Sequence, residues 1–344
     1  MSDAVGFGII GCGVIAPWHV AGIKGSSNAR LVAVCDIIPE KAEKLAAENG
    51  NPRVCTDHRK LLEDPEVQAV CVCTPSGLHA KVGIDAAQAG KHVLSEKPID
   101  ITLENIDAFI AETKKAGVNL GCIFQRRTQP LWIAVHDAVQ GGKLGKMVLA
   151  DAYIKYYRSQ EYYDSAGWRG TWEMDGGGAL MNQGVHCVDL MRWLAGPPST
   201  IYDRCDHLVR KIEVEDPAVA AITYASGAFG VLEGTTSVWN APGHRLEFHG
   251  EKGNILLEGE RIVKWETEDG EGAPELVDPQ AGSASANPVD IGKEGHRRQI
   301  SDFAASIVEG RQPMIPGEEA RGAVEFILAI YESSRRGEPV KLPL

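Results

Sequence analysis

A short apolar run near the start of the chain leads directly into a glycine-rich turn. Val5–Ile10 is followed by Gly11-Cys12-Gly13-Val14-Ile15-Ala16, a G-x-G-x-x-A pattern. In such a turn the first glycine permits the bend, the second lets phosphates approach the backbone, and the small third residue allows a helix to pack on the strand. Free N–H groups at the start of that helix attract phosphate oxygens. The pattern therefore predicts a dinucleotide-binding turn with contacts from Gly11, Gly13, Val14 and Ile15.

A carboxylate after the next apolar run indicates which dinucleotide binds. Asp36 directly follows Leu31–Cys35 and comes 25 residues after Gly11. A carboxylate at this place accepts hydrogen bonds from both ribose hydroxyls of NAD and repels the 2′-phosphate of NADP. Ile37 comes next, and neither Arg nor Ser directly follows to receive that phosphate. The sequence therefore predicts NAD as the cofactor, with Asp36 and Ile37 beside its ribose.

Strand-like and helix-like segments alternate before residue 125. The apolar runs are Val5–Ile10, Leu31–Cys35, Ala69–Cys73, His92–Leu94 and Val118–Phe124, and helical spacing occurs in segments such as Pro39–Asn49 and Leu103–Ala116. Short apolar strands that alternate with amphipathic helices are typical of a parallel sheet covered on both faces. We therefore expect an NAD-binding Rossmann domain over residues 1–124.

The pattern changes after residue 124. Helical spacing is found at Leu131–Gln140, Ala179–Leu194, His296–Glu309 and Gly317–Arg336, and strand-like runs separated by turns fill most of residues 146–265. The turn at 225–228 predicts a hairpin, and the composition of Glu268–Gly292 predicts a surface loop. We expect residues 125–344 to form an α+β domain with an open, mainly antiparallel sheet that binds substrate and joins subunits. The expected fold class is α/β overall.

Composition narrows the classes of partner. The chain has 344 residues, 44% of them hydrophobic, and a net charge of −12 with no block of Lys or Arg. This length suits two domains, and the acidic balance argues against nucleic acid and membrane surfaces as partners. No run approaches the ~18 apolar residues that cross a bilayer, and the start of the chain has no features of a signal peptide. Eight cysteines without a C-x-x-C pair argue against zinc and disulfides and favour the cytoplasm.

Three more motifs carry residues suited to catalysis. Thr74-Pro75-Ser76-Gly77-Leu78-His79 and Ser95-Glu96-Lys97-Pro98 follow two of the apolar runs, where open parallel sheets bind ligands. Further on, Gly176-Gly177-Gly178 precedes a helix on which Asn182 and His186 share a face, with Asp189 one turn beyond. A lysine that is partly desolvated and lies near the cationic nicotinamide ring has a lowered pKa, which suits it to proton transfer. Taken singly, Lys97 is better explained as a solvated charge, and a lone helical histidine such as His186 is more often structural than catalytic.

In this order, G-x-G-x-x-A, T-P-x-x-x-H, E-K-P and G-x-H-x-x-D-L resemble the glucose–fructose oxidoreductase/inositol dehydrogenase/MocA (Gfo/Idh/MocA) family over nearly the whole chain. The resemblance implies an NAD-dependent sugar dehydrogenase that acts on a CH–OH group and forms homodimers or homotetramers through its C-terminal sheet. It also implies that Lys97 is the catalytic lysine and that His186 accepts and donates the proton. By the same likeness the cofactor is lined by Thr74, Ser76, His79, Glu96 and Lys97.

A narrower resemblance concerns the substrate. Residues 159–164 (SQEYYD), 167–172 (GWRGTW) and 181–183 (MNQ) are similar to the bacterial nucleotide-sugar 3-dehydrogenases, which oxidise the C3 hydroxyl of UDP-N-acetylglucosaminuronate. The inositol-dehydrogenase pattern has Asp four residues before the helix histidine, where this chain has Asn182. An amide positions a hydroxyl but cannot take its proton. Free glycosides or cyclitols are the alternative substrates, and a non-catalytic dinucleotide-binding regulator is a third interpretation, which the presence of both Lys97 and His186 disfavours.

The remaining candidates contact cofactor or substrate. Arg126 and Arg127 follow the run Val118–Phe124, and an arginine binds a uronate or diphosphate with two parallel hydrogen bonds; solvated surface arginines are as common. Tyr156 offers a ring that stacks on sugar, although aromatic residues in strands pack in a core more often. The expected substrate contacts are Lys97, Arg126, Arg127, Tyr156, Asn182, His186 and Asp189. Gln125, Trp168 and Arg169 are assigned to the cofactor, and no metal ligand is expected.

Overall fold

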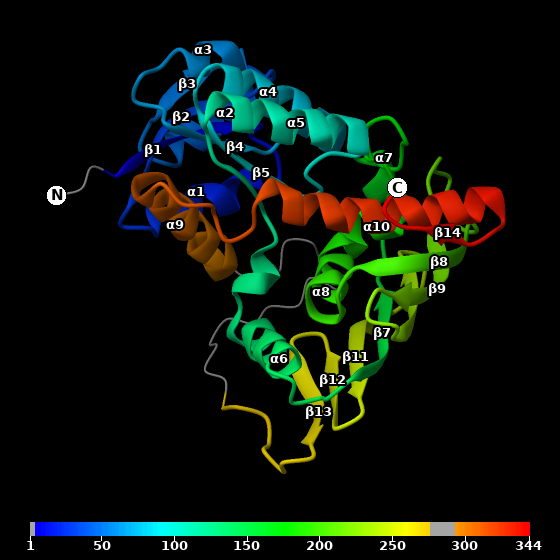
Figure 1. Ribbon diagram of the computed structural model, residues 1–344. Helices are drawn as coiled ribbons and strands as arrows, with labels where there is room; N and C mark the ends of the chain where they lie inside the picture. Colours follow the sequence, from blue (N-terminus) through cyan, green and yellow to red (C-terminus); the bar gives the residue numbers. More distant parts are fainter. Residues whose placement is uncertain (1–3, 276–292) are drawn as a thin grey trace. The chain divides into compact units, whose positions relative to one another are not determined.

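The computed structural model describes residues 4–275 and 293–344, which divide into two compact units (Figure 1). The first unit is Met1–Gln125 with Lys293–Arg321, and the second is Arg126–Gly292 with Gly322–Leu344. Each unit contains one β-sheet. The predicted fold class, a parallel Rossmann sheet followed by an α+β unit with a mainly antiparallel sheet, is confirmed.

The first unit is a six-stranded parallel sheet in the order β3-β2-β1-β4-β5-β6. The strands are β1 (Val5–Ile10), β2 (Ala29–Cys35), β3 (Arg53–Cys55), β4 (Ala69–Val72), β5 (His92–Ser95) and β6 (Leu120–Cys122). The helices that alternate with them are α1 (Ala16–Lys24), α2 (Pro39–Ala47), α3 (His58–Leu62), α4 (His79–Gln88) and α5 (Leu103–Ala116). The strand order reverses beside β1, and ligands bind at such a reversal, outside the carboxyl ends of the strands.

A helix from the far end of the sequence completes this unit. Helix α9 (Lys293–Glu309) packs on α1 (Figure 1). Gly22 permits the approach, because a Cβ there would lie 2.6 Å from Ile300 Cδ1. The ring of Phe303 lies 6.4 Å from that of Phe7, centroid to centroid. The division expected between residues 124 and 125 differs from this arrangement, since residues 293–321 return to the first unit.

The second unit is built on an eight-stranded sheet in the order β13-β12-β11-β7-β10-β9-β8-β14. The strands are β7 (Met147–Lys155), β8 (Pro198–Cys205), β9 (Pro217–Tyr224), β10 (Phe229–Thr235), β11 (Gly243–Gly250), β12 (Gly253–Glu258), β13 (Arg261–Thr267) and β14 (Val340–Lys341). Neighbouring strands are antiparallel except β7 and β10. The predicted hairpin at 225–228 is confirmed as the turn between β9 and β10. Alternate residues of β9 are buried and exposed, so one face of the sheet is covered.

The helical segments of the second unit follow the predicted pattern with one difference. They are α6 (Pro130–Gln140), α7 (Gln160–Asp164), η3 (Ala179–Gly184), α8 (Val185–Ala195) and most of α10 (Gly317–Arg336). The helix predicted over Ala179–Leu194 begins with the wider π-helical turn η3 before the regular α8. Such turns widen a helix locally and occur often at functional sites.

Two further sequence expectations concern short or irregular segments. The edge strand β3 is not foreseen, because a strand of three residues with two exposed side chains shows no apolar run. The part of the predicted loop Glu268–Gly292 beyond residue 275 lies outside the described residues. Among the helices that the structure describes, none has the length and apolar content needed to cross a bilayer.

Two buried carboxyl groups of the second unit have strongly raised pKa values. Burial raises the pKa of Asp203 from 3.8 to about 7 and that of Glu215 from 4.5 to about 7. Asp203 is 1% exposed, and its contacts with Cys205, Arg204 and Val219 offset the effect of burial only in part. A raised folded-state pKa means that stability is lost as the pH rises towards that value.

We therefore expect Asp203→Asn to stabilise the protein at neutral and alkaline pH. The variant cannot ionise, so its advantage over the wild type should grow by about 2–3 kcal/mol between pH 5 and pH 8. Urea unfolding at both pH values measures this difference. Asp206→Asn is the control, because the Asp206 side chain is 65% exposed. An equal advantage at the two pH values would contradict the assignment.

Candidate functional site

The predicted cofactor residues of the first unit lie at the carboxyl ends of its parallel strands. Gly11 follows β1, Asp36 follows β2, Thr74 lies just beyond β4, and Glu96 follows β5. Because the strands are parallel, these ends share one edge of the sheet. Gln125 follows β6 by a few residues at the same edge and is 5% exposed.

The two glycines of the first turn, Gly11 and Gly13, are needed for different reasons. Gly11 has φ of +96°, and a Cβ there would lie 2.5 Å from the carbonyl oxygen of Cys73. The fold itself therefore requires Gly11. A Cβ on Gly13 would have no atom within 4 Å, so no contact among the described residues requires a glycine there. The open space in front of Gly13 fits the phosphates of a dinucleotide, with Val14, which is 64% exposed, beside it.

The Asp36 carboxylate is held in one orientation by the backbone. Its Oδ2 accepts the N–H of Cys12 at 2.8 Å, and its Oδ1 accepts the N–H of Ile38 at 2.9 Å. Ile37, between them, is 87% exposed. The carboxylate is thereby tied to the glycine turn, where the ribose hydroxyls of NAD would reach it.

The T-P-x-x-x-H and E-K-P motifs are joined by one imidazole. His79 lies 2.9 Å (Nε2) from the carbonyl oxygen of Thr74 and 2.7 Å (Nδ1) from that of Pro98. The ring is 1% exposed, so it contacts the protein more than it could contact a ligand. Ser76 is also buried. The buried Oγ1 of Thr74 has no hydrogen-bond partner among the described residues and is available to a cofactor.

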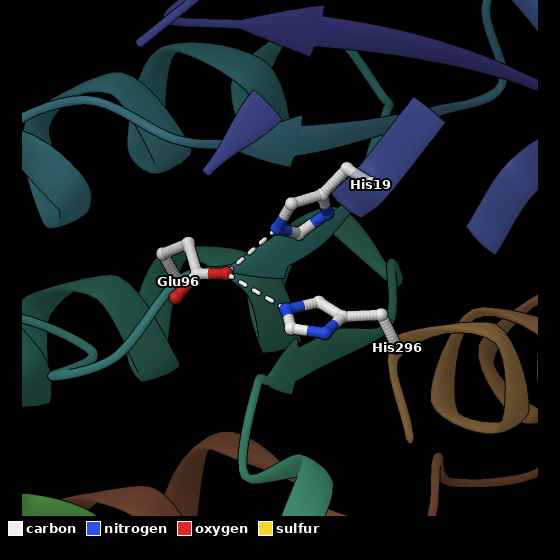
Figure 2. Close-up of side chains that lie close together, drawn as sticks. All are labelled: His19, Glu96 and His296. Carbon is white, nitrogen blue, oxygen red and sulfur yellow. Dashed lines mark hydrogen bonds and ion pairs between the residues drawn. The ribbon is translucent and has the colours of Figure 1, made fainter. Parts of the chain in front are cut away.

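Glu96 faces two histidines in the interior of the first unit (Figure 2). Its Oε1 lies 2.7 Å from His19 Nε2 and 3.5 Å from His296 Nε2. Its Oε2 accepts the backbone N–H of Lys97 at 3.2 Å. The carboxylate thus connects α1, α9 and the residue that carries the predicted catalytic amine. We interpret this His19–Glu96–His296 triad as the group that holds the backbone of Lys97.

The charges of the triad follow from its contacts. Burial by itself would raise the pKa of Glu96, but hydrogen bonds from His19 and His296 outweigh it and hold that pKa well below its usual value. Burial lowers the pKa of His296, whereas Cys73 and Cys71 raise the pKa of His19 well above its usual value against the effect of burial. The Glu96 carboxylate is thus ionised, its shortest contact is with His19, and His296 beside it stays neutral.

Histidine and glutamate also bind metal ions, and the ligand atoms of the triad lie within 4.8 Å of one another. Two ligands of a tetrahedral zinc ion, each about 2 Å from the metal, lie about 3.3 Å apart. The 2.7 Å between His19 and Glu96 is shorter and is a hydrogen-bond distance. Neither histidine was identified from the sequence, because each is a lone histidine within a helix.

In the second unit, Asp175 positions the predicted residue Asn182. Asp175 Oδ1 accepts a hydrogen bond from Asn182 Nδ2 at 2.6 Å, and its Oδ2 accepts the N–H of Gly170 at 2.9 Å. Asp175 is 1% exposed and was not identified from the sequence, although it directly precedes the glycine run. It joins the segment that contains Trp168 and Arg169 to the helix turn that carries Asn182.

A second carboxylate shapes the start of the same helix. Glu215 accepts the N–H of Gly178 at 2.8 Å and that of Leu180 at 2.9 Å. These contacts satisfy donors at the entry to η3, and α8 follows directly with His186 as its second residue. His186 is 8% exposed. The glycine run is needed for this packing, because a Cβ on Gly178 would lie 1.9 Å from the carbonyl oxygen of Glu215.

Trp168 and Arg169 belong to an aromatic and cationic cluster. The Arg169 guanidinium lies 4.8 Å from the Trp168 ring centroid and 4.2 Å from that of Tyr162. The Tyr162 hydroxyl is also hydrogen-bonded to Arg169 and accepts from Gln183 Nε2 at 3.0 Å. The structure therefore brings the predicted Trp168, Arg169 and Asn182 into one connected group.

The two arginines after β6 are bound inside the second unit. Arg127 forms a bidentate ion pair with Asp189, through Nε at 2.8 Å and Nη2 at 2.5 Å. Arg126 donates to Cys187 Sγ at 3.3 Å and lies 3.5 Å from Glu260 Oε1. Arg126 and Arg127 are 8% and 5% exposed. These contacts favour a structural role for both arginines and for Asp189.

Tyr156 belongs to the same buried group as Arg126. Its hydroxyl lies 3.1 Å from His244 Nδ1, and its side chain is 3% exposed. Burial raises the pKa of Tyr156, so the hydroxyl stays neutral and holds its hydrogen bond. The aromatic ring is therefore a core residue, the more common of the two interpretations weighed from the sequence.

Comparisons with known proteins agree with this arrangement. The family model described as "Oxidoreductase family, NAD-binding Rossmann fold" matches residues 5–124. The model described as "GFO/IDH/MocA C-terminal domain" matches residues 132–256. The two matches cover more than half of the chain.

Individual relatives match along their whole length. The solved WlbA dehydrogenase from Bordetella pertussis, in complex with NADH and UDP-GlcNAcA, is 33% identical with a TM-score of 0.88, covering 99% of this chain and 100% of that one. The WlbA dehydrogenase from Chromobacterium violaceum, also with NADH and UDP-GlcNAcA, is 32% identical with a TM-score of 0.89, covering 100% and 98%. The myo-inositol 2-dehydrogenase of Thermotoga maritima is 27% identical, covering 97% of this chain and 98% of the relative.

The two glycines of the first turn give a matched pair of predictions. Gly11→Ala should lose at least about 1 kcal/mol of stability, because alanine is strained at positive φ and its Cβ would meet Cys73. Gly13→Ala should unfold like the wild type but bind NADH at least tenfold more weakly. Thermal unfolding and fluorescence titration with NADH measure the two effects. Normal NADH affinity in Gly13→Ala would exclude this turn as the phosphate site.

A second prediction concerns the pair Asp175 and Asn182. Asn182→Asp would place a carboxylate against Asp175, and two such groups cannot both ionise at this distance. The pKa of the pair rises, so the variant should lose stability as the pH rises from 5 to 8. The double variant Asp175→Asn/Asn182→Asp reverses the partners and should recover most of the loss. Thermal unfolding at both pH values tests this, and a loss independent of pH would contradict it.

Proposed function

This chain belongs to the Gfo/Idh/MocA family of NAD-dependent oxidoreductases, and we propose that it oxidises the C3 hydroxyl of UDP-N-acetylglucosaminuronate or a closely related nucleotide sugar. The observation that carries the substrate is the full-length likeness, at 33% identity, to a dehydrogenase solved with NADH and UDP-GlcNAcA. Asn182 supports it, because its contact with Asp175 needs an amide donor where the inositol-dehydrogenase pattern has a carboxylate.

In the proposed reaction NAD, when bound, accepts a hydride from the sugar carbon. The turn at Gly11 and Gly13 binds the pyrophosphate through backbone N–H groups at the start of α1. The Asp36 carboxylate accepts hydrogen bonds from the ribose hydroxyls and repels the 2′-phosphate of NADP. Thr74 Oγ1 supplies a further hydrogen-bonding group at the same edge of the sheet.

Lys97 and His186 manage the hydroxyl proton in this proposal. A ring nitrogen of His186 accepts the proton, and the Lys97 ammonium stabilises the negative charge that develops on the substrate oxygen. Glu96 holds the Lys97 backbone through its contact at 3.2 Å. Asn182 donates to Asp175 through its NH₂ group, so the group that it turns to a substrate hydroxyl is its carbonyl oxygen, an acceptor.

A free cyclitol or glycoside is the second candidate substrate. It is favoured by the full-length likeness to the myo-inositol 2-dehydrogenase, although at 27% identity. Both candidates use the same proposed proton chemistry and differ in whether the substrate carries a diphosphate and a uronate.

We also propose a homo-oligomer that assembles through the open face of the second-unit sheet. Phe229 of β10 and Leu149 of β7, which are register partners on neighbouring strands, are 61% and 40% exposed. Apolar patches of this kind mark protein–protein interfaces more often than plain surface. All eight cysteines are free, which supports a cytoplasmic location.

The proposed function predicts which substrate yields NADH in a single turnover. With excess NAD, absorbance at 340 nm should rise with UDP-N-acetylglucosaminuronate and not with glucose, glucuronate or inositol. Lys97→Ala should lower the rate by at least ~10²-fold, since general acid–base catalysis contributes about that much or more. Lys91→Ala is the control, because the Lys91 ammonium donates to the carbonyl oxygen of Asp64 and Lys91 is not one of the proposed site residues. Full activity of Lys97→Ala would overturn the assignment of the lysine, and NADH from inositol alone would favour the cyclitol.

A further inference from the structure

A cavity of about 490 Å³ in the second unit is lined by several basic side chains. Three cationic residues line it, Arg169, Arg210 and Lys211, together with His207. The lining includes two carboxylates, and each already has a donor. Asp164 Oδ1 accepts from Gln160 Nε2 at 3.0 Å, and Glu213 Oε2 accepts the N–H of Trp172 at 3.1 Å.

The two arginines of this cavity lack an acidic partner at their Nε atoms. Arg169 Nε and Arg210 Nε are buried, and within the described residues neither has a hydrogen-bond partner. The Arg210 guanidinium lies 5.1 Å from the Tyr157 ring centroid, as that of Arg169 lies over Tyr162. Stacking on a ring fixes the plane of a guanidinium and leaves its N–H edge for an anion. A buried donor without a partner is rare in folded proteins, and both of these arginines line the cavity with their side chains.

The backbone that carries Arg210 and Lys211 is preorganised. The buried Asp216 carboxylate accepts the N–H groups of Leu208 at 2.6 Å, Val209 at 2.9 Å and Arg210 at 2.9 Å. Gln160 Oε1 accepts the N–H of Lys211 at 2.9 Å. The segment is therefore held in place before any ligand arrives, which reduces the entropy lost on binding.

A direct contact connects this segment to the cluster at Trp168. Glu213 donates its backbone N–H to the carbonyl oxygen of Gly170 at 3.0 Å. Gly170 is in turn held by Asp175, the partner of Asn182. The basic cavity and the residue expected to position the sugar hydroxyl therefore belong to one hydrogen-bonded assembly within the second unit.

We propose that this cavity is the subsite for the diphosphate of a nucleotide-sugar substrate, bound by Arg169, Arg210 and Lys211. The proposal rests on the nucleotide-sugar function proposed above and moves the anion site away from Arg126 and Arg127, whose guanidinium groups already face Glu260 and Asp189. Two planar guanidinium groups and one ammonium match the charge and the spread of oxygens of a diphosphate. A free cyclitol carries no charge for them to bind. In this assignment Arg169 serves the substrate.

Calorimetric titration of the full-length protein with UDP tests the subsite without requiring catalysis. Arg210→Gln and Lys211→Gln should each weaken UDP binding at least tenfold, and Arg210→Lys should recover part of the loss. NADH affinity should stay within twofold in every variant, because the dinucleotide turn is in the first unit. Arg204→Gln is the matched control, since Arg204 is an exposed arginine of β8 in the same unit that does not line the cavity.

Titration with two other anions shows whether the cavity recognises a diphosphate, a single phosphate or a carboxylate. Inorganic phosphate and glucuronate should bind at least tenfold more weakly than UDP, and equal binding of either would overturn the assignment to a diphosphate. Undiminished UDP affinity in both glutamine variants, or no UDP binding to the wild type, would overturn the subsite. Failure of the proposed function is distinguishable, because it would appear as Lys97-independent activity or as NADH formed only from free sugars in the turnover assay. Circular dichroism confirms that each variant is folded.

Discussion

A carboxylate buried in a folded chain must be surrounded by hydrogen-bond donors, because water no longer solvates it. In this chain each segment of proposed function is built around one such group. Glu96 holds the backbone of Lys97, and Asp175 holds Asn182. Asp216 accepts three consecutive backbone N–H groups of the basic segment that ends at Arg210. The backbone or side-chain position of each of these segments is therefore set by a buried carboxylate.

Hydrogen-bond donors oppose the effect of burial on the pKa of such a group. Burial would raise the pKa of Asp216, but Ser237 and the three backbone N–H groups lower it below the usual value. Asp203 lies in the same unit, and there burial outweighs its hydrogen bonds and raises its pKa to about 7. The pKa values of these two buried aspartates are thus shifted in opposite directions, and the lowered one belongs to the carboxylate that accepts three consecutive backbone N–H groups.

Local patterns in the sequence predicted the parts of the site that are local in the structure. The glycine turn, Asp36 and the two motifs at the ends of β4 and β5 act with near neighbours in one strand-and-turn unit. His19 and His296 were missed because they meet only when α9 returns to the first unit, 277 residues along the chain from His19. Asp175 was missed for a related reason, since its partner Gly170 gives no signal at the level of side chains.

The roles of the arginines could not be predicted from the sequence either, because they depend on which charged or aromatic residue lies beside each one in the fold. A sequence shows that Arg126 and Arg127 are cations near a strand end, but not that Glu260 and Asp189 lie beside them in the fold. Arg169 and Arg210 have aromatic rings beside them instead. A guanidinium paired with a buried carboxylate is neutralised, whereas one that stacks on a ring keeps its charge and its directed N–H groups. Which arginine can bind an anionic substrate is therefore decided by the residue that the fold places against it.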